Sequence, residues 1–146
     1  MSSSLRIFAI PRGYKFIKSS LLYISGVLVL LGIKRIYDKV ELTDGKRVLI
    51  DGLWPRGVRK STSNIDMWFK EVAPSKELRL WFSHDPAKWE GFKKRYMKEL
   101  ESNNSLNTLI DMIKEEDITL VYATKDEKHN NAIVLAEVIR ERIKRG

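Results

Sequence analysis

The sequence contains no cysteine. Its absence from all 146 residues excludes disulfide bonds, thiolate catalysis and cysteine-based zinc sites. Histidine is scarce as well. The two that occur, His84 and His129, lie far apart in the chain, so a metal cluster would have to be completed by carboxylates. We therefore predict no metal site, and the lack of cysteine fits a cytoplasmic protein.

No hydrophobic run is long enough for a membrane-spanning helix. The longest, residues 21–33, has about 13 residues, whereas a spanning helix needs about 20. A signal peptide is the second interpretation, but no small-residue cleavage site follows the run. We expect residues 1–32 to be a basic and apolar N-terminal extension, arising from an over-long start-site assignment, and residues 33–146 to form the domain. A membrane-associated or signal-like segment is the alternative, although membrane contact through residues 21–32 is not expected.

Recognisable nucleic-acid and phosphate-binding motifs are missing too. The chain has no glycine-rich phosphate loop, no RRM or KH pattern and no internal repeat. Its net charge is +8, of which residues 1–32 contribute four cations and no acid, so residues 33–146 carry 8 − 4 = +4. The domain is therefore mildly basic, which favours anionic partners such as nucleic acid or a phosphorylated small molecule.

What the sequence does contain is an alternation of strand and helix patterns. The run at 118–124 is almost continuously apolar, as in strands buried on both faces of a parallel sheet. Ser63 or Asn64, Ser75 and Asp85 are placed to cap helices. Strands separated by helices predict a single compact α/β domain whose mostly parallel sheet is covered by helices on its faces. The expected strands are 33–40, 47–51 and 118–124, and the expected helices are 65–73, 76–82, 86–102, 105–117 and 129–146. The turn through 44–45 could close a hairpin or begin a longer excursion.

Several blocks of the sequence, in this order, resemble the DUF488 family in its YeaO-like branch. The blocks are IKRIYD, DGKRVLIDGLWPRG, WFKEVAPSKELRLWF, WEGFKKRYMKEL and TLVYATKDEKHNNAIVLAEVI. The resemblance covers residues 33–145 and implies a compact α/β domain with the Trp-Pro-Arg-Gly loop as a signature, but it implies no particular substrate or cofactor. One departure is Gly52, where the family usually has arginine.

Charged residues follow two of the expected strands. Asp51 ends the strand at 47–51 and Arg56 follows it, whereas Lys125 and Asp126 come after the strand at 118–124. Ligands of open α/β sheets bind beyond the carboxyl ends of strands, so these four side chains are expected to converge if the strands are parallel neighbours. We predict an anionic or nucleotide-like ligand held by Arg56 and Lys125, with Asp51 or Asp126 as acid/base groups.

Three further residues complete the predicted site. Trp54, Gly57 and His84 are candidates for ligand contacts, and the site would serve a binding protein or an enzyme alike. Each also has a structural interpretation. Trp54 could fill the core, Gly57 could only turn the chain, and His84 could cap or pack.

The charged groups have structural alternatives as well. Asp51 could pair with Arg56 or accept loop amides, and Lys125 with Asp126 could form an exposed ion pair of little energetic weight. An alternative function is a non-catalytic nucleic-acid or protein-binding module that uses a basic surface. The sequence does not indicate an oligomeric state.

Overall fold

Five strands form one mixed sheet in the order β1-β2-β5-β3-β4. The structure is a computed structural model, and it describes residues 19–146. The strands are β1 (Ser19–Ile24), β2 (Val27–Arg35), β3 (Lys46–Leu49), β4 (Met67–Trp68) and β5 (Ile118–Tyr122). The helices are α2 (Lys76–Phe82), α3 (Trp89–Glu101), α4 (Asn104–Glu115) and α5 (Asn131–Arg145).

Strand β5 occupies the centre of the sheet. It pairs in parallel with β2 on one side and with β3 on the other, and β4 extends the parallel part beyond β3. All five residues of β5 are buried, which confirms the prediction made from its apolar run. Strand β1 is the antiparallel edge. It joins β2 through Ser25 and Gly26, both with positive φ, as tight two-residue hairpins require.

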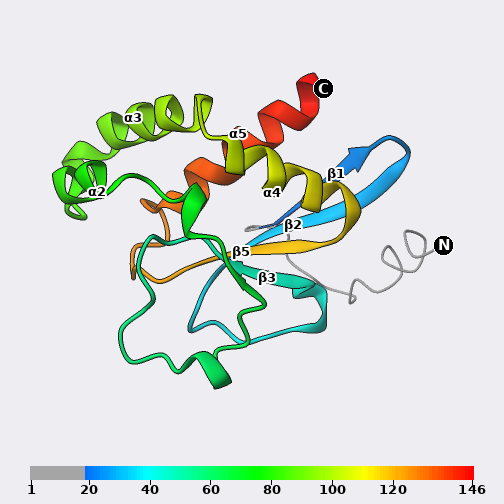
Figure 1. The fold of residues 1–146 in the computed structure, drawn as a ribbon, viewed down its shortest axis with the longest axis horizontal. Helices are drawn as coiled ribbons and strands as arrows, with labels where there is room; N and C mark the ends of the chain where they lie inside the picture. Colours follow the sequence, from blue (N-terminus) through cyan, green and yellow to red (C-terminus); the bar gives the residue numbers. More distant parts are fainter. Residues whose placement is uncertain (1–18) are drawn as a thin grey trace.

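The helices gather on one face of the sheet (Figure 1). Side chains alternate along a strand, so Val48 and Ile50 of the β3 segment face the helices and Leu49 faces the other way. The main core therefore lies between the sheet and α2 to α5. On the opposite face, Leu49 and Val121 pack against aromatic and aliphatic side chains of the loop between β3 and β4. The predicted α/β domain with a mostly parallel sheet is confirmed, with loops in place of helices on this second face.

Local capping explains where the helices begin. Ser75 Oγ accepts a hydrogen bond from the amide of Leu78 (3.1 Å) and so caps α2, as the sequence predicts. Asp85 caps the short 3-10 turn that leads into α3. Asn103 and Asn130 cap α4 and α5 with their side-chain oxygens. These short-range bonds depend only on neighbouring residues, which is why the starts of α2 and of the turn before α3 were readable from the sequence.

The predicted helix at 65–73 was wrong. Met67 and Trp68 instead form β4, which is followed by a 3-10 turn at Lys70–Val72. The amide of Phe69 donates to the carbonyl of Leu49 at 2.8 Å, so hydrogen bonding to β3 replaces the bonds of a helix. The pairing partner lies about 20 residues upstream, and helical periodicity in the segment gives no sign of it.

Strand bounds near the N-terminus also differ from expectation. The strand expected at 33–40 is β2, which begins at Val27 and ends at Arg35. Residues 19–32, assigned to the extension, thus contribute β1 and most of β2, whereas residues 1–18 lie outside the described part. The turn at 44–45 does not close a hairpin, because β5 lies between β2 and β3. No helix of residues 19–146 combines the length and apolar character needed to cross a membrane.

Candidate functional site

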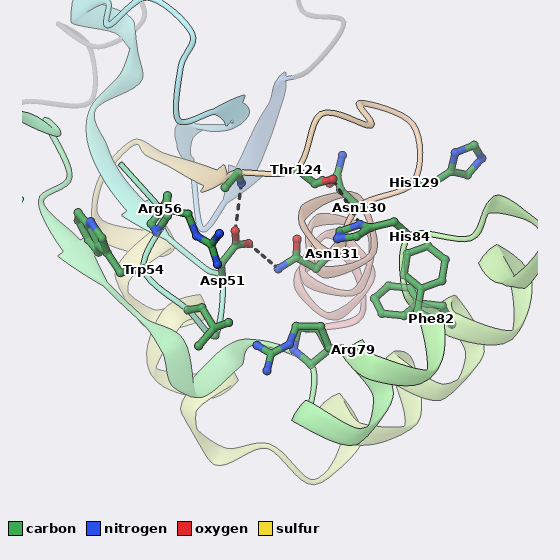
Figure 2. Close-up of a pocket in the computed structure, with 16 residues that line it drawn as sticks. Asp51, Trp54, Arg56, Arg79, Phe82, His84, Thr124, His129, Asn130 and Asn131 are labelled. Atoms are coloured by element: carbon green, nitrogen blue, oxygen red, sulfur yellow. Dashed lines mark hydrogen bonds between the residues drawn. The ribbon is translucent and has the colours of Figure 1, made fainter. Parts of the chain in front are cut away.

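A cavity of about 390 Å³ opens at the carboxyl ends of β3 and β5. Its wall is built by the loop after β3, the segment after β5, the start of α5 and the end of α2 (Figure 2). Parallel strands direct their carboxyl ends to one edge of the sheet, and such edges are the usual ligand sites of α/β folds. The volume lies in the lower part of the range of small-molecule pockets.

Asp51 is held rigidly in this cavity. Its Oδ2 accepts from the amide of Ala123 (3.0 Å) and its Oδ1 accepts from the side-chain amide of Asn131 (3.0 Å). The backbone carbonyl of Asp51 accepts from Trp68 Nε1 at 2.8 Å. The same Asn131 amide nitrogen also donates to the carbonyl of Ile50 (3.1 Å). The segment after β5 and the start of α5 therefore fix the carboxylate, Trp68 of β4 fixes the backbone beside it, and no residue of 19–146 forms an ion pair with the carboxylate.

Burial raises the pKa of Asp51 above its ordinary value. The hydrogen bonds from Asn131 and Ala123 and the positive charge of Arg79 act in the opposite direction, because each of them favours the ionised form. The carboxylate is therefore a desolvated group whose ionisation depends on the donors around it. Such a combination is common at functional sites.

Two arginines line the cavity beside this carboxylate. Arg56 comes from the loop after β3 and Arg79 from the last turns of α2 (Figure 2). Within the described residues, neither side chain makes a hydrogen bond or an ion pair. Gly52 leaves the room that Arg79 occupies, because a Cβ at position 52 would lie 3.1 Å from Arg79 Nη1. Two guanidinium groups are thus available to a ligand.

The Trp-Pro-Arg-Gly loop is folded upon itself. Trp54 Nε1 donates to the carbonyl of Val58 at 2.6 Å, and Gly57 takes a positive φ of 78°. The Trp54 ring meets Trp68 edge-on, with ring centroids 5.5 Å apart. Trp54 thus packs on the second face of the sheet and also lines the cavity. Gly57 turns the chain and is not part of the cavity wall.

The two histidines lie at the end of the cavity that is remote from Trp54 (Figure 2). His84 follows α2 with a positive φ of 57°, and its Nδ1 lies 3.4 Å from Thr124 Oγ1. His129 Nδ1 lies 2.9 Å from Asp126 Oδ2, and this bond lowers the pKa of Asp126. A positive φ is uncommon for a residue with a side chain, and at His84 it brings the ring to the cavity.

The structure brings together part of the predicted set. Asp51, Trp54, Arg56 and His84 line the cavity, whereas Gly57, Lys125 and Asp126 do not. Lys125 is exposed. The carboxylate of Asp126 accepts from the amides of Lys128 and His129, in the turn before α5. Asp51 does not pair with Arg56, and the loop-amide alternative describes its surroundings better.

Sequence reasoning missed several polar residues of the cavity wall, namely Arg79, Thr124, His129, Asn130 and Asn131. Arg79 lies within a short amphipathic helix, where an arginine gives no local sign of a site. Asn131 stands next to the helix cap Asn130, and a second asparagine there was the only available hint. Among residues 19–146, no group of three or more histidines or carboxylates could hold a metal ion.

The fold and the cavity define a small α/β domain with a ligand-sized hollow at the carboxyl ends of its parallel strands. The chain belongs to the DUF488 family, because the family model described as "Inactive DUF488-N3 subclade" matches residues 30–146. The resemblance seen in the sequence is confirmed.

Curated relatives agree with this assignment. The chain is 40% identical over 108 residues to "Uncharacterized protein YeaO" of Escherichia coli. The matched segment covers 73% of this chain and 94% of that protein. It is 38% identical over 110 residues to "Uncharacterized protein Rv3073c" of Mycobacterium tuberculosis. Here the matched segment covers 75% of this chain and 93% of that protein. No solved structure gives a significant match.

Proposed function

We propose that the cavity binds a small anionic ligand, with Arg56 and Arg79 as the groups that hold the anion. The observation that carries this proposal is the pair of guanidinium groups that line one cavity without a hydrogen bond or ion pair to any of residues 19–146. A guanidinium can hold a phosphate or carboxylate through two parallel hydrogen bonds.

The remaining charges of the wall support an anion. Two arginines and one aspartate give the lining a net charge of +2 − 1 = +1 with both histidines neutral. Asn130 and Asn131 place the start of α5, a helix of 15 residues, against the cavity. The N-terminal end of a helix carries a partial positive charge, which favours anions nearby.

A binding role fits the site better than catalysis. The matching family model is described as inactive. Asp51 is the one carboxylate among the lining residues, and both of its oxygens already accept bonds from the protein. Asp126, the other candidate for acid/base chemistry, does not line the cavity, and its carboxylate is bonded to His129. A pair of carboxylates acting on one substrate therefore has little support, and we propose binding without turnover.

Isothermal titration calorimetry at low salt tests the proposal. The probes are inorganic phosphate and nucleoside monophosphates, titrated into the wild-type chain and into Arg56→Ala and Arg79→Ala variants. A charge-assisted hydrogen bond contributes about 1.5–3 kcal/mol, so each variant should weaken binding by about tenfold to a hundredfold.

The matched control is Arg59→Ala. Arg59 is an exposed arginine on the same loop that is absent from the cavity wall, so its loss should leave affinity nearly unchanged. If no probe binds, or if all three arginine variants weaken binding equally, the proposal fails.

A second candidate function, nucleic-acid binding, rests on the lysines beside Trp68 and beside Trp54 of the cavity wall. Lys60 Nζ lies 5.4 Å from the ring centroid of Trp54 and 5.3 Å from that of Trp68, and Lys70 Nζ lies 5.3 Å from the latter. Cations next to aromatic rings are typical of single-strand binding surfaces. A labelled oligonucleotide should then bind with an affinity that falls steeply as salt rises and that Lys60→Ala reduces. Absence of binding at low salt would remove this candidate.

A further inference from the structure

Asp51 restricts the kind of anion that the cavity can accept. Its carboxylate lies in the same cavity wall as Arg56 and Arg79 (Figure 2). A ligand that is anionic throughout would meet this negative charge in a partly desolvated space, where like charges repel strongly. The site therefore discriminates against simple anions, unless the ligand also offers something to Asp51.

Hydrogen-bonding capacity remains at Asp51. An ionised carboxylate has about four acceptor sites, and protein donors reach each oxygen once, from Ala123 and from Asn131. Each oxygen thus keeps acceptor capacity, and the two protein donors fix the plane of the group. A carboxylate held in this way is prepared to accept N–H groups from a ligand, and desolvation makes an unmet acceptor costly.

Aromatic and aliphatic side chains form much of the remaining wall, beside polar residues at the segment after β5 and the start of α5. Phe82 and Phe92 stack with ring centroids 4.4 Å apart, and Trp54 and Pro55 lie on the loop after β3. Pockets of this kind hold the apolar body of a ligand, while a few polar groups fix its orientation. A flat or apolar ring is the body that such walls suit.

We propose that the ligand is amphoteric: a ring-bearing small molecule with an anionic group for Arg56 and Arg79 and an N–H donor for Asp51. This inference rests on the proposed function of the same cavity and deepens it. Two sources share this chemistry. In a nucleotide the base edge supplies the N–H groups, and in an aromatic amino acid the ammonium group supplies them.

Matched ligand pairs test the inference on the unmodified protein. Adenosine monophosphate and purine riboside monophosphate, whose base carries no N–H group, differ by one amino group, and phenylalanine and 3-phenylpropionate also differ by one. Calorimetry should show about tenfold or more tighter binding of the amino-bearing member in one pair, because the other member leaves an oxygen of Asp51 without its donor. The pair that discriminates identifies the source. Equal affinities within both pairs, alongside measurable phosphate binding, would overturn the inference.

The variant Asp51→Asn should change the binding of the two kinds of ligand in opposite directions. Removing the negative charge should strengthen the binding of inorganic phosphate, while the preference for the amino-bearing ligand should disappear. Asp111→Asn, on an exposed position of α4, is the control and should change neither value. If Asp51→Asn damaged the fold, the binding of phosphate and of the amino-bearing ligand would weaken together. Stronger phosphate binding therefore cannot result from misfolding. A retained amino preference in Asp51→Asn would contradict the inference, whereas failure of every ligand, phosphate included, would refute the proposed function itself.

Discussion

Replacing Asn131 by alanine should weaken the fold and the site together. The side-chain amide nitrogen of Asn131 donates to the carbonyl of Ile50 (3.1 Å) and to Oδ1 of Asp51 (3.0 Å). Asn131 is the first residue of α5, and the cap is provided by its neighbour Asn130. Alanine suits a helix well, so the substitution removes the two hydrogen bonds and leaves the helix itself intact.

The expected loss follows from the two acceptors left behind. An acceptor that loses its partner away from water costs about 1–3 kcal/mol, and a charged one lies toward the upper end. The costs for the two acceptors would sum to about 2–6 kcal/mol. Asp51 lines the cavity, so water can replace part of its lost bonding, whereas Ile50 is fully buried. We therefore expect the free energy of unfolding to fall by about 2–3 kcal/mol at neutral pH.

The loss should depend on pH with a defined sign. Burial raises the pKa of Asp51 in the folded protein, and the hydrogen bond from Asn131 opposes that rise. A carboxyl group with a raised folded pKa binds more protons in the folded state, so stability falls as pH rises from the unfolded pKa through the folded pKa. Without Asn131 the folded pKa rises further. The loss of unfolding free energy in Asn131→Ala should be smallest below the ordinary carboxyl pKa. It should be complete above the raised pKa that Asp51 has in the folded variant.

Urea denaturation at several pH values measures both effects. The control is Asn104→Ala, because Asn104 is the first residue of α4, is exposed, and follows the capping residue Asn103. The Asn104→Ala variant should lose no more than about 0.5 kcal/mol of unfolding free energy at any pH. Equal losses in the two variants would refute the role given to the Asn131 amide. A deficit of Asn131→Ala that does not shrink on acidification would refute its coupling to Asp51.

Two further predictions concern the framework. Gly45 and Gly57 both have positive φ, but a Cβ at Gly45 would lie 2.4 Å from the carbonyl oxygen of Asp117, whereas none of the described atoms lies within 4 Å of a Cβ at Gly57. In urea denaturation, Gly45→Ala should cost about 3 kcal/mol or more and Gly57→Ala about 1 kcal/mol; equal costs would contradict the steric argument. Tyr96→Phe removes a buried hydroxyl that donates to the carbonyl of Val72 at 2.5 Å, and the same assay should show a loss of about 1–3 kcal/mol; a neutral result would show that Val72 finds another donor.

The sequence placed His84 and three residues of one segment at the cavity that the structure shows, and it misplaced Lys125 and Asp126. Asp51, Trp54 and Arg56 belong to one short segment at the end of β3, so a single strand assignment located all three. Lys125 was placed by the same rule at the end of β5, but its side chain is exposed and does not line the cavity. Strand ends determine where a loop begins, and the direction of each side chain depends on the path of that loop.

The sequence by itself determined the features that depend on neighbouring residues. A continuous apolar run marked β5, and side-chain oxygens of Ser75 and Asp85 marked helix starts. Alternation of these elements was sufficient for the fold class, and the ordered blocks were sufficient for the family. Local hydrogen bonding and periodic burial are properties of short segments, so they can be read without the rest of the chain.

Only the tertiary structure decided which distant residues meet. It placed β5 between β2 and β3, turned an expected helix into β4 by pairing it with β3, and brought Asn131 and Arg79 to Asp51. Such contacts span from about 20 to 80 residues of chain. They follow from the packing of whole elements, which short-range sequence patterns do not specify.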